Sequence, residues 1–100
     1  KEIMLKEFAP ELLDSGVVVI DFYADWCGPC KSFMPTFEAT SEKFDHTFTK
    51  INVDEHSDLA QKFGIRTIPC IVVLNDGHEV DRKAGSISAS VFEDWLENIT

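Results

Sequence analysis

The sequence lacks the features that would mark a membrane protein or a nucleic-acid-binding protein. Its longest apolar runs, around Val17–Ile20 and Ile71–Leu74, have the length of a strand, whereas a membrane-spanning helix needs about 20 residues. Its nine lysines and arginines are scattered among 18 acidic residues, and the formal net charge is −9. Because binding to phosphates or to anionic lipid needs a concentrated basic face, we expect no nucleic-acid partner and no membrane partner.

No internal repeat and no linker rich in proline, glycine and serine divides the 100 residues. We therefore expect residues 1–100 to form one domain of a common size. Hydrophobic residues make up 44% of the chain and charged residues 27%, as in ordinary soluble globular proteins. Residues 1–5 are too few and too charged for a secretory signal, so we expect a cytoplasmic protein.

Apolar periodicity predicts alternating strands and helices. Apolar and β-branched runs predict four strands, at residues 17–24, 48–53, 70–74 and 78–83. Helical spacing predicts four helices, at residues 8–13, 29–44, 57–63 and 90–99, and the pattern allows a short N-terminal strand before them. This order predicts an α/β fold: a three-layer α/β/α sandwich in which helices flank a central mixed β-sheet.

Polar and turn-forming residues predict where these elements begin and end. Ser57 is expected to cap the third helix, and Ser90 with Glu93 is expected to form a capping box for the last one. Pro35 lies inside the long helix and should kink it. Asn75-Asp76-Gly77 predicts a tight turn, so the last strand should return antiparallel as a charged sheet edge.

Three cysteines are present, an odd number that argues against a purely structural disulfide framework. Cys27 and Cys30 stand where the first predicted strand ends and the long helix begins, close enough on one helical turn to form a disulfide. The helix N-terminus favours the thiolate of Cys27, whereas Cys30 lies one turn inside. We therefore predict that Cys27 is the attacking nucleophile and that Cys30 resolves the mixed disulfide.

Two other interpretations of this pair are a zinc half-site and a static disulfide. Zinc needs about four ligands, and no second Cys-x-x-Cys or nearby pair of histidines supplies the rest. A static bridge that closes so short a loop would contribute little stability. Reversible redox chemistry is therefore the favoured interpretation.

The segment Trp26–Lys31, Trp-Cys-Gly-Pro-Cys-Lys, preceded by Asp21-Phe22-Tyr23-Ala24, resembles the thioredoxin family. The resemblance runs nearly end to end and includes Pro35, residues 50–54, residues 64–69, the turn at 75–77 and Gly85. It implies the thioredoxin fold and a protein-disulfide reductase or electron carrier that exchanges thiols and disulfides through Cys27 and Cys30.

We assign the tuning of the redox pair to Trp26, Gly28 and Pro29. Gly28 and Pro29 bring no charge and no side-chain donor, so the thiolate is only moderately stabilised and the pair should give up its electrons readily. The resemblance also associates Gly-Pro at this place with reducing members of the family.

Asp21 interrupts a strand that should be buried, and burial should raise the pKa of its carboxyl. Asp21 is therefore a candidate for proton transfer near Cys30; the alternative is an idle, solvated acid at the strand edge. The resemblance implies that Asp21 assists deprotonation of Cys30 through water and that Lys50 is its partner. For Lys50, a solvated strand lysine is the alternative.

Pro69 permits either peptide isomer on sequence grounds, and the resemblance implies a cis-proline loop that faces the cysteines. The backbone of Ile68 would then pair with an extended substrate. The predicted docking surface also contains Val53, Thr67 and Gly85, with Trp26, Gly28, Pro29 and Ser86 around it. Packing in the core is the alternative for Val53 and Ile68.

Cys70 stands where the family commonly has threonine. It is interpreted either as a small buried hydrophobe or as a regulatory thiol close to the active site. Thr67 and Ser86 replace residues that are often glycine and alanine, which leaves the choice of target open. His46, His56 and His78 are expected at the surface.

We therefore predict a monomeric thiol–disulfide oxidoreductase without a bound cofactor, whose redox group is the Cys27–Cys30 disulfide. The resemblance implies two kinds of partner, disulfide-containing target proteins and a thioredoxin reductase, the latter an NADPH-dependent flavoprotein or a ferredoxin-linked enzyme. The alternatives are a non-catalytic, chaperone-like binding subunit and an exported reductant; a domain of a disulfide isomerase is disfavoured by Gly-Pro.

Overall fold

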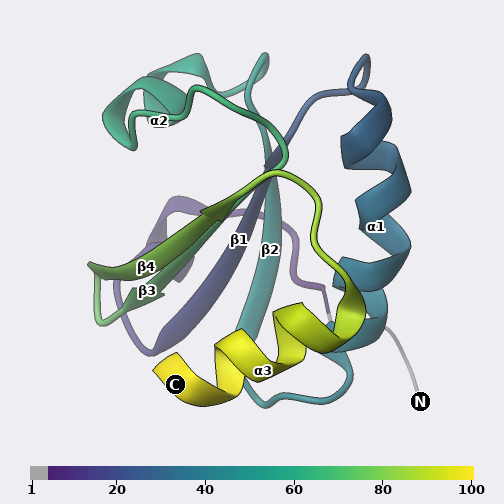
Figure 1. Cartoon of the computed structure of the whole chain (residues 1–100). Coiled ribbons are helices and arrows are strands. Elements are labelled where there is room, and N and C mark those ends of the chain that lie inside the picture. Colours follow the sequence, from purple (N-terminus) through teal and green to yellow (C-terminus); the bar gives the residue numbers. More distant parts are fainter. Residues whose placement is uncertain (1–4) are drawn as a thin grey trace.

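Figure 1 shows a computed structural model of the chain, which describes residues 5–100. Its four strands are β1 (Val17–Tyr23), β2 (Thr47–Asn52), β3 (Cys70–Asn75) and β4 (His78–Ala84). They form one sheet in the order β2-β1-β3-β4, in which β1 pairs in parallel with β2 and antiparallel with β3. The predicted mixed sheet is confirmed.

The sequence of each strand matches its place in the sheet. The central strands β1 and β3 are runs of valine, isoleucine and leucine that are buried on both faces. The edge strand β4 is charged and largely exposed, which discourages pairing with another chain. Asp76 and Gly77 join β3 to β4 with φ angles of 51° and 85°, as a two-residue turn of this hand requires.

Helices cover both faces of the sheet, as predicted for a three-layer sandwich. On one face lie α1 (Gly28–Ser41) and α3 (Ala89–Ile99), which bury an aromatic core against β1 and β3. The members of this core are Val19, Phe33, Phe37, Phe48, Ile71, Val73, Phe92, Trp95 and Leu96. The opposite face is covered by α2 (Ser57–Lys62) and the 3-10 turn η1 (Pro10–Leu13).

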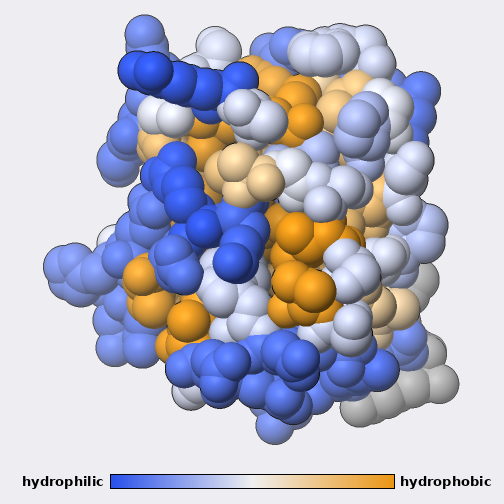
Figure 2. All heavy atoms as spheres, viewed as in Figure 1, coloured by the Kyte–Doolittle hydropathy of each residue, from blue (hydrophilic) through white to orange (hydrophobic). Residues whose placement is uncertain are grey.

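The surface seen in Figure 2 carries both hydrophilic and hydrophobic side chains. On the face that Figure 2 shows, hydrophilic side chains cover the outer side of α3, and apolar side chains appear in patches between hydrophilic ones. No helix among residues 5–100 is long and apolar enough to cross a membrane.

Several predicted boundaries are wrong. Ser88, not Ser90, caps α3: its hydroxyl accepts the Val91 N–H at 3.3 Å, while Ser90 is already helical. Glu93 forms an ion pair with Lys43 at 3.0 Å instead of closing a capping box.

Other helices are shorter than predicted. The first helix is only the turn η1, and α1 ends at Ser41. The helix α2 begins at Ser57 itself, so its N-cap position is held by His56 and not by Ser57 as predicted. Phe44 packs against the core from the segment after α1. Its apolar side chain therefore continued the helical pattern of the sequence although the residue is not in the helix. Most of the N-terminal strand allowed by the sequence lies outside the described residues, and Leu5 forms a single bridge to Phe48.

Candidate active site

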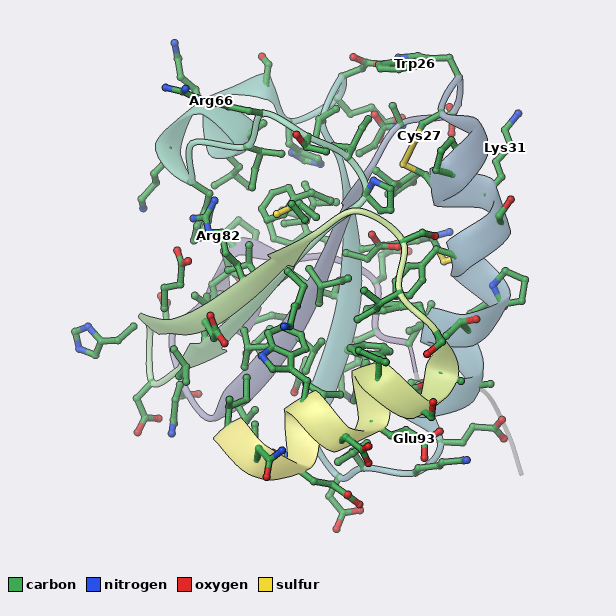
Figure 3. All side chains as sticks on the ribbon, in the orientation of Figure 1. Trp26, Cys27, Lys31, Arg66, Arg82 and Glu93 are labelled. Atoms are coloured by element: carbon green, nitrogen blue, oxygen red, sulfur yellow. A yellow bond between two sulfur atoms is a disulfide. The ribbon has the colours of Figure 1, made fainter. Side chains whose placement is uncertain are left out.

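The two cysteines lie at the junction of β1 and α1, where they form a disulfide with a Cα–Cα distance of 5.3 Å (Figure 3). Cys27 is the N-cap of α1, with extended backbone angles, and Pro29 occupies the first turn, where proline is tolerated. The predicted position of the pair is therefore the observed one, at the start of the long helix.

The two sulfur atoms have different environments at the start of α1. The backbone N–H of Cys30 donates a hydrogen bond to Cys27 Sγ at 3.2 Å. After reduction, this N–H and the positive end of α1 stabilise negative charge on Cys27 Sγ. Both residues are buried, with exposed fractions of 4% for Cys27 and 1% for Cys30, so the inner residue is also the less accessible one.

Trp26 covers this end of the molecule (Figure 3). Its side chain is 70% exposed, and its indole N–H donates to Asp54 Oδ2 at 2.9 Å. The backbone N–H of Asp54 in turn donates to Asn52 Oδ1 at 2.9 Å. Asp54 is not among the residues predicted for the site. The feature of the sequence that could have identified Asp54 is its position shortly after β2, because β2 runs parallel to β1 and ends beside it.

Asp21 is fully buried in the middle of β1, on the same side of the sheet as Val19 and therefore on the side of α1. Neither carboxyl oxygen has a hydrogen-bond partner among the described residues. Burial raises the pKa of Asp21 to about 7, and the positive charge of Lys50 acts in the opposite direction. This is the environment of a group that takes up and releases a proton near neutral pH.

Lys50 is the register neighbour of Asp21 on β2, but its ammonium group is exposed and lies 5.4 Å from the centre of the Tyr23 ring. A cavity of about 140 Å³ lies between Lys50, Tyr23 and the redox site, because Tyr23, Lys50 and Cys30 all line it. Its other lining residues are Ala24, Asp25, Lys31 and Met34. The volume accommodates several water molecules of about 30 Å³ each.

The loop before β3 lies against the cysteines. The Ile68–Pro69 peptide bond is cis, and the Ile68 carbonyl oxygen lies 3.8 Å from Cys27 Sγ. Ile68 and Val53 pack against the cluster of Ala24, Cys27 and Cys30, and both remain half-buried rather than entering the core fully.

Gly85 fixes the far side of this loop by donating its N–H to the Pro69 carbonyl at 2.7 Å. Its φ angle of +89° suits glycine, because a side chain is strained in that region. Thr67 and Ser86 are both exposed and adjoin Ile68 and Gly85.

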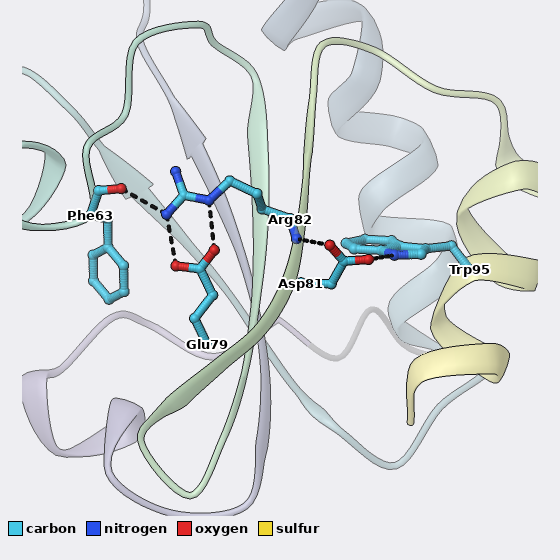
Figure 4. A network of polar contacts seen from close by, with 5 residues as sticks. All are labelled: Phe63, Glu79, Asp81, Arg82 and Trp95. Atoms are coloured by element: carbon cyan, nitrogen blue, oxygen red, sulfur yellow. Dashed lines mark hydrogen bonds and ion pairs between the residues drawn. The ribbon is translucent and has the colours of Figure 1, made fainter.

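A polar network braces the other end of the loop (Figure 4). Arg82 of β4 donates to the Phe63 carbonyl at 2.7 Å, at the point where α2 ends, and pairs with Glu79 through two hydrogen bonds of 2.6 and 2.7 Å. Its neighbour Asp81 accepts the Trp95 indole N–H at 2.8 Å. The edge strand is thus tied both to α2 and to α3.

Cys70 is free and buried in the core on the α2 side of the sheet, opposite the side that Asp21 faces. Burial raises the pKa of its thiol. Among residues 5–100 there is no group of three or more histidines, cysteines and acids that could hold a metal ion. The histidines lie away from the cysteines: His46 bonds to Thr100, His56 contacts Phe8 and His78 is exposed.

Comparison with known proteins agrees with this arrangement. The sequence model of the family described as Thioredoxin matches residues 1–98. A thioredoxin of Mycoplasmoides gallisepticum is 37% identical over 99 residues, covering 97% of this chain and 99% of its own. Among solved structures, a thioredoxin of Nicotiana alata is 34% identical with a TM-score of 0.88, covering 99% of this chain and 95% of that one.

A thioredoxin of Schistosoma mansoni is also 34% identical, with a TM-score of 0.87 and coverage of 96% and 95%. These matches span the whole sandwich, and the Cys27–Cys30 disulfide stands at the start of α1. The chain therefore belongs to the thioredoxin family of thiol–disulfide oxidoreductases.

Proposed function

We propose that this oxidoreductase reduces disulfides of other proteins in two steps with fixed roles for its cysteines. The thiolate of Cys27 attacks one sulfur of the target disulfide, forms a mixed disulfide and releases the other target sulfur as a thiolate. The thiolate of Cys30 then attacks Cys27 Sγ, which breaks the mixed disulfide, releases the second target thiolate and restores the Cys27–Cys30 bond. Two electrons pass to the target.

The hydrogen bond from the Cys30 N–H to Cys27 Sγ carries this assignment. It stabilises the thiolate of Cys27 in the reduced protein, and among residues 5–100 no hydrogen bond to Cys30 Sγ is found. The nucleophile that starts the reaction is therefore the sulfur at the N-cap.

Asp21 is proposed to accept the proton of the Cys30 thiol through water in the cavity that Cys30 lines. A pKa of about 7 suits a general base at neutral pH, because the group is then often ionised yet still binds a proton well. Lys50, which lines the same cavity as Cys30, would assist by offsetting part of the effect of burial, so that the pKa of the carboxyl stays near neutral pH.

Target proteins are proposed to dock as an extended segment against Ile68, with Trp26 and Val53 beside it. The support is that the Ile68 carbonyl faces Cys27 Sγ and that the side chains of Ile68 and Val53 stay half-buried. The net charge of −9 favours partners with a basic contact face.

An NADPH-dependent flavoprotein reductase is proposed to reduce the Cys27–Cys30 disulfide again after each turnover. The protein is proposed to act as a monomer without a bound cofactor and to be located in the cytoplasm. The support is the family itself and the uncharged Gly28-Pro29 pair, which favours a reducing potential. Fluorescence microscopy of the full-length gene product carrying a tag tests the location, and an exported product would contradict it.

The test of the mechanism is turnover of insulin disulfides with NADPH and a purified flavoprotein reductase. Cys27→Ser should abolish turnover, whereas Cys30→Ser should accumulate a mixed disulfide between Cys27 and insulin, detected by mass spectrometry. Cys70→Ala is the matched control and should retain turnover, because Cys70 lies in the opposite core. A mixed disulfide that instead formed through Cys30 in Cys27→Ser would reverse the assigned roles.

A further inference from the structure

Lys50 and Asp21 form no salt bridge among the described residues, although they are register partners on adjacent parallel strands. The Lys50 ammonium lies instead over the Tyr23 ring, 5.4 Å from its centre, within the range of a cation–π contact. The carboxyl of Asp21 is left without a hydrogen-bond partner among the described residues.

Tyr23 lies where its ring can determine the position of the Lys50 ammonium. It ends β1, two residues after Asp21 and therefore on the same side of the sheet. Tyr23 and Lys50 line the cavity beside Cys30, and both also line a larger cleft of about 720 Å³ that extends toward η1 and α2. The ring and the ammonium thus contribute to the walls of both hollows.

We propose that Tyr23 is a positioning residue for proton transfer: its ring holds the Lys50 ammonium toward solvent, so that the Asp21 carboxyl stays free to take up the proton of Cys30. The proposal rests on the proposed role of Asp21 as the proton acceptor. Nothing in it requires the Tyr23 hydroxyl, because the contact with the ammonium is made by the ring.

The other charged groups near this site have separate positions. Asp25 and Lys31 line the cavity beside Cys30, and Glu55 lines the larger cleft. Burial raises the pKa of Tyr23 most, the charges of Asp25, Glu55 and Asp21 also raise it, and a side-chain hydrogen bond with Asn52 lowers it. The side chains of Asp25, Lys31 and Glu55 are exposed.

Asp21 itself is affected chiefly by its burial and by Lys50. Cys70, the titratable group of β3, packs on the opposite side of the sheet, although the Asp21 charge contributes to raising its thiol pKa. Burial is the larger cause of the raised pKa of Asp21, and the position of the Lys50 ammonium therefore determines how far that rise is offset.

The experiment is a ¹³C NMR titration of the Asp21 carboxyl in the oxidised protein, where Cys27 and Cys30 cannot titrate; Asp21→Asn assigns the resonance. Tyr23→Leu should lower the pKa of Asp21 by about one unit, because the released ammonium can approach the carboxylate. Tyr23→Phe keeps the ring and should leave that pKa at its parent value.

Lys50→Met separates the proposed route from a structural effect. In the Lys50→Met background, Tyr23→Leu should cause no further decrease in the pKa of Asp21. An unchanged pKa in Tyr23→Leu, or the same decrease with and without Lys50, overturns the proposal, since the second result means that the smaller side chain only admits water. Amide NMR spectra of each variant verify that it is folded.

The rate of mixed-disulfide resolution as a function of pH distinguishes this proposal from the role of Asp21. If Asp21 accepts the proton, the midpoint of the rate profile in Tyr23→Leu should move in the direction of the carboxyl titration. A titration that shifts without any shift of the rate profile supports the control of Asp21 by Tyr23 and Lys50 and refutes Asp21 as the acceptor.

Discussion

Replacing Asp21 by asparagine should make the oxidised protein more stable, and more so as the pH rises. The carboxyl of Asp21 is fully buried with no hydrogen-bond partner among the described residues, and its pKa is raised to about 7. In the unfolded chain the same carboxyl has an ordinary pKa near 3.8. Folding therefore opposes ionisation of this group, and asparagine, which resembles the protonated acid in shape, removes that opposition.

The sign follows from the two pKa values. Between about pH 4 and pH 7 the folded state holds one proton more than the unfolded state, so the free energy of unfolding falls as the pH rises. The slope is about 1.4 kcal/mol per pH unit, and it vanishes above the folded pKa. The whole penalty is about 4 kcal/mol above pH 7, and about 3 kcal/mol of it develops between pH 5 and pH 8.5.

Urea unfolding of the parent and of Asp21→Asn at several pH values from 5 to 8.5 measures this quantity. The other titrating groups are shared, so the difference between the two free energies isolates Asp21. We expect that difference to grow by about 3 kcal/mol in favour of the variant, with similar m-values. A difference that is constant over this pH range would refute the reasoning, because it would mean that the pKa of Asp21 is alike in both states.

Two further predictions concern the rest of the core. Cys70 in the native oxidised protein should not react with iodoacetamide, since it is 3% exposed and burial raises the pKa of its thiol; one alkylated residue per chain, found by mass spectrometry, would favour the regulatory interpretation. Trp95→Phe removes the hydrogen bond to Asp81 and should lower the free energy of unfolding by about 1–2 kcal/mol in urea. In an Asp81→Ala background, which has no acceptor for the indole N–H, the same substitution should matter less, and an equal loss would assign the effect to packing.

The layers of the fold could be predicted because burial determines them directly. A strand buried on both faces must be almost wholly apolar, and residues 17–23 and 70–74 have that composition. Helix ends were harder to place. Ser88 and Ser90 both offer a hydroxyl ahead of the same apolar stripe, and the one that caps α3 depends on where the backbone leaves the turn at Gly85. That turn is anchored to Pro69, far away in the sequence.

In the site, the local parts could be predicted and the side-chain contacts between strands could not. The spacing of Cys27 and Cys30 places both sulfurs on one helical turn, so their disulfide follows from the sequence. The hydrogen bond from Trp26 to Asp54 joins residues 28 positions apart and depends on two parallel strands ending side by side. Strand register brings Lys50 next to Asp21, but register does not say which way a long, flexible side chain turns.

The buried carboxyl also links the two redox states of the protein. Asp21 faces α1, which carries Cys30, so in the reduced form an ionised Asp21 and a Cys30 thiolate would place two negative charges on the same side of the sheet, and like charges disfavour each other's ionisation. The two groups then lose their protons as a coupled pair, whose apparent pKa values belong to neither residue alone. The oxidised form removes the thiol from that equilibrium. A comparison of the Asp21 titration in the two forms therefore measures the coupling itself, and identical titrations would show that the carboxyl does not sense Cys30.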